Sequence, residues 1–102
     1  MPLRRLEEKL TKENLWIYLL SLLDEKDMYG YELRDAVHGR FGFRPGNVTA
    51  YRVLYTLKRD GLVATANKRV GGRERKYYQI TRKGAKELAG GKEILKRTLS
   101  KL

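Results

Sequence analysis

Residues 62–84 read LVATANKRVGGRERKYYQITRKG, a segment in which two strand-like runs flank a pair of glycines. Two runs within it, Leu62 to Asn67 and Arg75 to Ile80, are rich in β-branched, small or aromatic residues, which favours β-strands. Gly71 and Gly72 lie between the runs and supply a tight turn, because glycine adopts positive φ angles without steric cost. The stretch therefore predicts a β-hairpin whose tip is formed by residues 68–73.

Helical patterns precede the hairpin. From Thr11 to Glu25, leucines and Tyr18 recur three and four positions apart, which is typical of an amphipathic helix. A second helix is predicted from about Tyr31 to Gly42, and we expect Tyr18 and Tyr31 to lie in the core. Leucines at helical spacing among charged residues also predict a short amphipathic arm over residues 1–10.

The third predicted helix runs from Val48 to about Asp60 and has two different faces. Asn47 is suited to the N-cap and Gly61 to the C-terminal stop. One face is apolar and consists of Ala50, Val53, Leu54 and Leu57. The other face carries groups that donate or accept hydrogen bonds, namely Thr49, Arg52, Tyr55, Thr56 and Arg59.

A last helix is predicted from its N-cap, Thr81, toward the end of the chain. Its leucines form a seam that resembles a heptad repeat, although Gly90 and Gly91 interrupt it. The members of the seam are Leu88, Leu95, Leu99 and Leu102. Such a seam is typical of a dimer interface; the alternative is that these leucines cover their own domain.

This order of elements predicts a mainly α-helical domain with a small β-wing (an α+β fold), the winged helix-turn-helix plan. The length of 102 residues fits one domain, whose modest core would gain stability from oligomerisation. We assign residues 1–84 to a winged-helix DNA-binding unit with an N-terminal arm. Residues 85–102 are assigned to a C-terminal dimerisation helix.

Positive charge is densest around the hairpin. The formal net charge is +11, and residues 61–83 hold seven of the 23 Lys and Arg residues but one of the 12 Asp and Glu residues. A basic patch of this kind is the electrostatic footprint of nucleic-acid binding, whereas the alternative is a solvated surface or the protection of exposed strand edges by charge.

Two groups of residues are therefore predicted to contact DNA. The second helix of a helix-turn-helix pair enters the major groove, so the predicted recognition-helix residues are Asn47, Thr49, Arg52, Tyr55 and Arg59. The wing would contact phosphates or the minor groove through Lys68, Arg69, Arg73, Arg75 and Lys76.

Other classes of function fit this sequence poorly. The chain has no cysteine and a single histidine, His38, and its adjacent acidic residues 24, 25 and 27 look like a solvated helix end. We therefore expect no enzymatic activity, no metal and no cofactor. No apolar run approaches the ~20 residues of a membrane span, and residues 1–10 lack the apolar core of a signal peptide, which favours the cytoplasm.

Three segments resemble the PadR-like family of transcriptional regulators. Residues 29–33, YGYEL, are similar to the HGYE(I/L) signature of that family at its second helix. Residues 72–84, GRERKYYQITRKG, are similar to the GRPRKYYRLTEAG segment of its wing and following helix. The recognition-helix pattern Y..L..L...GL is matched by Tyr51, Leu54, Leu57, Gly61 and Leu62. The resemblance covers about residues 15–90.

The resemblance implies a winged-helix dimer, usually a repressor, that joins largely through the C-terminal helix and binds double-stranded DNA at a pseudo-palindromic operator. It also implies that Tyr51 and its helix face the DNA. The chain departs from the family at Asn47-Val48, where the family often has Pro-Gly. A second departure is Arg52, because a proline commonly follows the tyrosine.

Some members of the family respond to phenolic acids or hydrophobic drugs that bind near the dimer interface. Trp16 lies beside the apolar stripe of the first long helix and is the candidate for lining such an effector pocket here. Packing against the partner chain is an equally reasonable use of this side chain, because indole buries a large area and donates one hydrogen bond.

Two other functions remain compatible with a winged helix. A protein-interaction module would bind an acidic protein and show no preference among DNA sequences. A non-specific architectural protein would bind every duplex with the same steep salt dependence. The cationic wing together with Arg52 and Arg59 favours a sequence-specific DNA-binding regulator.

Overall fold

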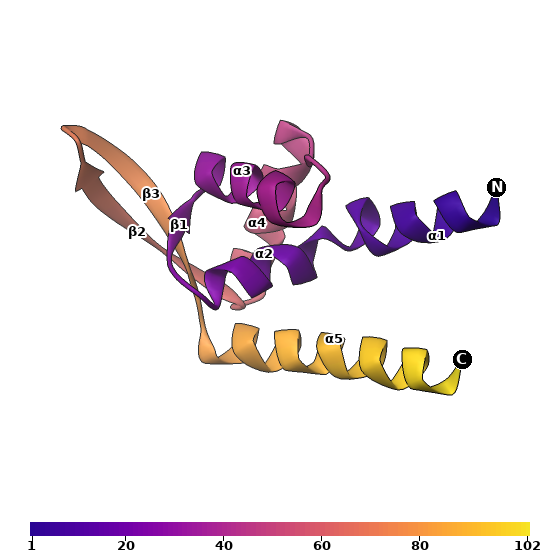
Figure 1. Cartoon of the computed structure of the whole chain (residues 1–102). Helices are drawn as coiled ribbons and strands as arrows, with labels where there is room; N and C mark the ends of the chain where they lie inside the picture. The colour runs from indigo at the N-terminus through magenta and orange to yellow at the C-terminus, as the bar shows by residue number, and fades with distance from the viewer.

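The computed structural model describes all 102 residues and follows the predicted plan (Figure 1). The elements along the chain are α1 (Pro2–Leu10), the 3₁₀ turn η1 (Lys12–Asn14), α2 (Leu15–Leu23), β1 (Met28–Tyr29), α3 (Gly30–Phe41), α4 (Asn47–Arg59), β2 (Val63–Val70), β3 (Arg73–Ile80) and α5 (Arg82–Lys101). The prediction of a mainly α-helical winged helix-turn-helix is confirmed. The molecule measures 50 × 28 × 21 Å, because the β2–β3 wing projects from one end while α1 and α5 extend toward the other (Figure 1).

Helix α2 is the centre of the core. Five of its nine residues are buried leucines: Leu15, Leu19, Leu20, Leu22 and Leu23. A helix that is apolar nearly all round must be covered on all sides, and α3, α4, α5 and β3 all pack against α2. Helix α4 contributes its predicted apolar face, with Ala50, Leu54 and Leu57 buried and Val53 half-buried.

The wing belongs to a three-stranded antiparallel sheet of order β1-β3-β2. Strand β1 pairs Met28 with Tyr78 and Tyr29 with Tyr77. The sequence did not predict β1, because two residues are too few to show an alternating pattern. The wing strands also run further than predicted, so that only Gly71 and Gly72 form the tip, with φ angles of 59° and 78°.

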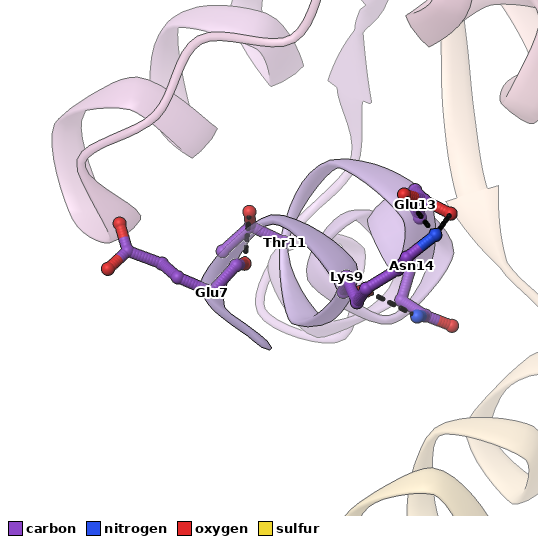
Figure 2. A network of polar contacts seen from close by, with 5 residues as sticks. All are labelled: Glu7, Lys9, Thr11, Glu13 and Asn14. Carbon is purple, nitrogen blue, oxygen red and sulfur yellow. Dashed lines mark hydrogen bonds and ion pairs between the residues drawn. The ribbon is translucent and has the colours of Figure 1, made fainter. Parts of the chain in front are cut away.

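The prediction of one helix starting at Thr11 is wrong, because a 3₁₀ turn at Lys12–Asn14 separates α1 from α2. The Thr11 hydroxyl donates to the Glu7 carbonyl oxygen at 2.8 Å, and the Asn14 amide donates to the Lys9 carbonyl oxygen at 2.6 Å (Figure 2). Polar side chains that bond the last carbonyls of a helix compete with its continuation. An ion pair of 2.9 Å between Lys9 and Glu13 bridges the same junction.

Two residue-level predictions are wrong. The N-cap of α4 is Gly46, whereas Asn47 is the first helical residue and no side-chain capping bond is formed. Tyr31 is 58% exposed instead of lying in the core. The buried stripe of α3 runs through Gly30, Leu33 and Val37, and Tyr31 lies off that stripe.

Helix α5 begins as predicted and then approaches the core closely. The Thr81 hydroxyl accepts a hydrogen bond from the Gly84 N–H at 3.0 Å, which confirms the N-cap. A Cβ at Gly91 would come within 2.7 Å of Ile17 Cδ1 and 2.9 Å of Trp16 Cη2. Gly91 therefore does not interrupt α5 but allows the continuous helix to lie against α2.

Only part of the predicted leucine seam is exposed. Leu88 is buried in the core of its own chain. For this residue, the alternative that the leucines cover their own domain is therefore correct. The apolar side chains that α5 exposes beyond it are Ile94, Leu95, Leu99 and Leu102. No helix of the chain combines the length and the apolarity that crossing a membrane requires.

Candidate nucleic-acid interface

Helix α4 presents a solvent-facing ridge opposite its buried stripe. Val48 and Tyr55 on this ridge are 70% and 69% exposed, and Arg52 and Arg59 lie beside them. An α-helix fits the major groove of DNA, and guanidinium, phenol and methyl groups can contact base edges there. The ridge is therefore the part of α4 best placed to read a duplex.

Other predicted α4 residues lie on its flanks rather than on the ridge. Thr49 lines a small hollow together with Lys12 and Arg44, beside η1. Tyr51 lies on the opposite flank, where its ring packs on Gly30 of α3 and stays 43% exposed. The two flanks therefore face different neighbours, η1 on one side and α3 with the wing on the other.

Two further α4 side chains already have partners within the chain. The Thr56 hydroxyl donates to the Arg52 carbonyl oxygen at 3.1 Å, which satisfies that hydroxyl locally. Arg59 Nε donates to Asp60 Oδ1 at 3.1 Å. Arg52 has no side-chain partner within the chain, so its guanidinium is the freer of the two arginines on the ridge.

The wing cations divide between two faces of the hairpin, because side chains alternate along a strand. Lys68 stands opposite Arg75 on the outer face, and Val70 stands opposite Arg73 nearer the tip. Asn67 stands opposite Lys76 on the other face of the hairpin. Tyr78 of β3 and Arg69 of β2 lie on this same face. The five predicted residues therefore do not form one continuous cationic surface.

On the outer face of the wing, each of the two opposing cations lies over an aromatic ring. Like charges at opposite positions of paired strands repel each other. The Arg75 guanidinium lies 4.3 Å from the centroid of the Tyr29 ring, and Lys68 Nζ lies 5.0 Å from that of Tyr77. The two rings meet edge to face with centroids 5.5 Å apart. Cation–π contacts of this kind offset the repulsion.

Asp27 ties the wing to the turn that precedes β1. Its Oδ2 accepts hydrogen bonds from Gln79 Nε2 at 2.9 Å and from Lys68 Nζ at 3.4 Å. The positive charge of Lys68 is therefore partly neutralised within the chain. The wing cations with neither an ion pair nor an aromatic ring beneath them are Arg69, Arg73 and Lys76.

A pocket of about 280 Å³ lies between the base of the wing and the helix-turn-helix. Its lining residues are Tyr29, Gly30, Tyr31, Tyr51, Arg75, Lys76 and Tyr78. Burial, with a smaller electrostatic contribution from the nearby Tyr51 phenol, raises the pKa of Tyr78 and keeps this phenol protonated.

A groove of about 470 Å³ lies between α2 and the exposed half of α5. The candidate effector residue Trp16 lines it, together with Ile17, Ile94 and Leu95. Tyr18 also lines the groove. Its hydroxyl donates to a carbonyl oxygen of α1 at 2.7 Å, and burial raises its pKa.

Comparison with known proteins identifies the family of this chain. The family model described as Transcriptional regulator PadR-like family matches residues 19–90. This chain belongs to the PadR-like family. The resemblance predicted from residues 29–33, 51–62 and 72–84 is thereby confirmed. An uncharacterized protein of Lysinibacillus sphaericus is 34% identical over 87 residues, covering 76% of this chain and 80% of that protein.

Solved structures share the PadR-like fold. A PadR family transcription regulator from Clostridium difficile superposes with a TM-score of 0.74 at 28% identity, over 84% of this chain and 94% of that chain. Bacillus subtilis PadR, solved in complex with operator DNA, gives a TM-score of 0.68 at 24% identity. That match covers 74% of this chain and 45% of the Bacillus protein, and it shows the likeness of fold.

The sequence did not predict that Gly30, Tyr31 and Tyr78 would share a pocket with Tyr51. Gly30 and Tyr31 belong to the YGYEL segment that resembles the family signature, so the signal was present in the motif. What pattern analysis did not reveal is that the start of α3 lies next to the wing, because that contact joins residues distant in sequence.

Proposed function

We propose that this PadR-like chain is a homodimeric, sequence-specific DNA-binding regulator that acts as a repressor at a pseudo-palindromic operator. The observation that carries the proposal is the exposed ridge of α4, with Arg52 free, beside a wing that bears unpaired cations. Bacillus subtilis PadR, which shares this fold, was solved with operator DNA and supports the same use of the fold here.

The ridge supplies the sequence-reading part of the proposed interface. Arg52 can place two N–H groups on the O6 and N7 atoms of a guanine, while Tyr55 and Val48 contact neighbouring bases or thymine methyl groups. Arg59 lies toward the end of α4 and is assigned to a phosphate. Asn47 and Thr49 lie in the first turn, where α4 would approach the backbone.

The wing supplies contacts that depend less on sequence. Arg69, Arg73 and Lys76 are free to neutralise phosphates, or to enter the minor groove where the potential is most negative. Lys68 and Arg75 hold the shape of the wing through Asp27 and Tyr29, in addition to adding positive charge.

The proposed dimer interface is the apolar surface shared by α1 and the exposed half of α5. Large apolar side chains at 42–98% exposure gather on these two helices, and contiguous patches of this kind mark interaction sites. They are Leu3, Leu6, Leu10, Ile94, Leu95, Leu99 and Leu102. Residues 1–84 then act as the DNA-binding unit and residues 85–102 as the dimerisation helix, with Leu88 serving the core.

Sedimentation equilibrium tests the dimer. Leu95→Glu places a charge in the proposed interface and should yield a monomer at micromolar concentration. Arg97 lies on the opposite side of α5, so Arg97→Glu is the matched control and should remain dimeric. A parent chain that is itself monomeric would refute the dimer.

Selection of binding sites from a pool of random duplexes tests the operator. The proposal predicts an inverted repeat whose half-sites lie about one helical turn apart, ~34–36 Å, because two symmetry-related α4 helices would dock in successive major grooves. Selected duplexes without a shared sequence would instead support the architectural alternative.

The groove lined by Trp16 is the proposed place for a hydrophobic effector. Because Trp16 is the chain's single tryptophan, its fluorescence reports on this groove directly. A planar phenolic or hydrophobic compound should change that emission with saturation and also change the affinity for DNA. Emission that stays constant across a panel of such compounds would remove the effector from the proposal.

A further inference from the structure

We infer that the pocket between the start of α3, Tyr51 and the base of the wing binds one phosphate of the DNA backbone, an inference that rests on the proposed function. The pocket holds about 280 Å³, enough to admit a phosphodiester group. It lies between α4 and the wing, the two elements proposed to contact DNA.

The open edge of β3 shapes this pocket. Strand β1 pairs only with Tyr77 and Tyr78, so the β3 edge at Arg75 and Lys76 has no neighbouring strand. Both residues line the pocket, Lys76 from the face that it shares with Tyr78 and Arg75 beside the Tyr29 ring that it covers, so positive charge borders this space. A short β1 therefore leaves a gap that a partner outside the chain can enter.

Tyr78 is a donor without a partner. Its side chain is more than nine-tenths buried, at 7% exposure, and its hydroxyl makes no hydrogen bond within the chain. The chain contains no fully buried side-chain oxygen that lacks a hydrogen bond, so this hydroxyl reaches a surface, and Tyr78 lines the pocket. Because the O–H group of this nearly buried phenol has no acceptor within the chain, it can donate to an acceptor from outside.

Other donors surround the same space. Tyr31 and Tyr51 line the pocket with hydroxyls that also lack partners within the chain. The 12-residue helix α3 begins at Gly30, and the first-turn N–H groups of a helix have no intrahelical acceptor and favour an anion. Phenols, cations and helix amides together suit the several acceptor oxygens of a phosphate.

The nearby carboxylate of Glu32 lies at the same helix N-terminus, but it already has partners within the chain. Glu32, in the first turn of α3, accepts from the Tyr29 N–H at 3.4 Å and forms an ion pair of 3.5 Å with Lys26. Its negative charge is partly neutralised by that lysine, and the pocket itself is lined by no acidic side chain. The charge of the lining is therefore positive.

The test removes single hydroxyls while keeping the rings. Tyr78→Phe and Tyr31→Phe should each weaken binding of a labelled duplex by about five-fold, the loss of one net hydrogen bond, with no loss of thermal stability. Tyr77→Phe is the matched control, because Tyr77 is adjacent on β3 but on the outer face, and its ring contacts survive. That variant should bind as the parent does.

A set of duplexes, each with one neutral methylphosphonate, then assigns the contact. One position should weaken the parent by more than about five-fold and weaken Tyr78→Phe by a smaller factor, because the neutral group removes the charge that all the pocket donors face, whereas Tyr78→Phe has already lost one of those bonds. Parent-like affinity in both Tyr→Phe variants, while Arg73→Ala still weakens binding, would overturn the inference and leave the proposed function intact. No DNA binding by the parent would instead refute the proposed function.

A titration with inorganic phosphate distinguishes the two possible ligands of the pocket, a phosphate of the DNA backbone and a small phosphate compound. Saturable, Tyr78-dependent shifts of the pocket amides in NMR at millimolar phosphate, with DNA affinity unchanged by Tyr78→Phe, would assign the pocket to a small phosphate compound and overturn the DNA assignment. If inorganic phosphate weakens DNA binding no more than another salt of equal ionic strength does, the result supports the assignment of the pocket to a DNA phosphate.

Discussion

The ring of Tyr51 lies directly on the backbone of Gly30, where a Cβ would come within 2.4 Å of the Tyr51 hydroxyl oxygen and 2.6 Å of its Cε1 atom. Helix α4, the proposed recognition helix, thus meets the start of α3 through a tyrosine and a residue that has no side chain. This contact sets the direction of Tyr51 and, with it, one wall of the pocket beside the wing.

Gly30→Ala should disturb this contact. The added methyl group forces the Tyr51 ring to move, and overpacking of this kind costs about 1–3 kcal/mol of unfolding free energy. We expect a lower urea midpoint and weaker DNA binding, measured by circular dichroism and fluorescence anisotropy. Gly39→Ala is the control in the same helix, since a Cβ there meets nothing within 4 Å. It should raise stability by about 0.5–1 kcal/mol, and equal effects at both positions would contradict the Tyr51 contact.

The adjacent glycines of α5 should respond differently to alanine. A Cβ at Gly90 meets nothing within 4 Å, so Gly90→Ala should increase the unfolding free energy by about 1 kcal/mol, the usual difference within a helix. Gly91→Ala should gain clearly less, because its methyl group presses on Ile17 and Trp16. Urea titrations of the two variants settle the order, and a larger gain at Gly91 would refute close packing of α5 on α2.

The salt dependence of DNA binding should distinguish the wing cations. Removal of a phosphate contact lowers the slope of log K against log salt by about 1, so Arg73→Ala should show nearly that change. Lys68→Ala should show a smaller one, because Asp27 already neutralises part of the Lys68 charge. Anisotropy titrations at four salt concentrations give both slopes. Identical slopes for the two variants would mean that the Asp27 contact does not persist in the complex.

Acid should weaken the fold partly through Glu25. The hydrogen bond from Arg40, whose Nη2 donates to Glu25 Oε1 at 2.8 Å, holds the pKa of Glu25 below its ordinary value of 4.5. A carboxyl group whose pKa is lowered by folding stabilises the native state above about pH 4.5, and this stabilisation is lost as the pH falls below that value. The effect is small because the pair is exposed.

Melting temperatures from pH 6 to pH 3 test this acid effect. Glu25→Gln should melt lower than the parent near neutral pH and approach it at pH 3. Glu93→Gln, an exposed residue of α5 without an ion pair, should run parallel to the parent at every pH. A constant offset between Glu25→Gln and the parent down to pH 3 would exclude the Glu25–Arg40 contribution.

The sequence predicted the features that arise from local patterns. The period of α4, the Gly71-Gly72 turn and the Thr81 cap all depend on residues within a few positions of one another, and all three are confirmed. Residues 29–33 and 72–84 carried the family resemblance for the same reason: each motif is contiguous.

What the sequence did not predict depends on contacts between distant segments. Strand β1 exists only because Met28 and Tyr29 meet β3, and the role of Gly91 follows from the position of α2. The helix expected from Thr11 was wrong because side chains of Thr11 and Asn14 hold the end of α1, a competition that apolar spacing does not reveal. The division of the wing cations between two faces likewise required the observed register.

Sequence-specific regulation is tested by measuring how the purified chain binds its own promoter fragment and an unrelated duplex of equal length at two salt concentrations. We expect tight promoter binding that survives competition by the unrelated duplex. Arg52→Ala should erode the preference for the promoter, and Arg73→Ala should weaken binding to both duplexes. Equal affinity for both duplexes, or no binding at low salt, would contradict a sequence-specific regulator.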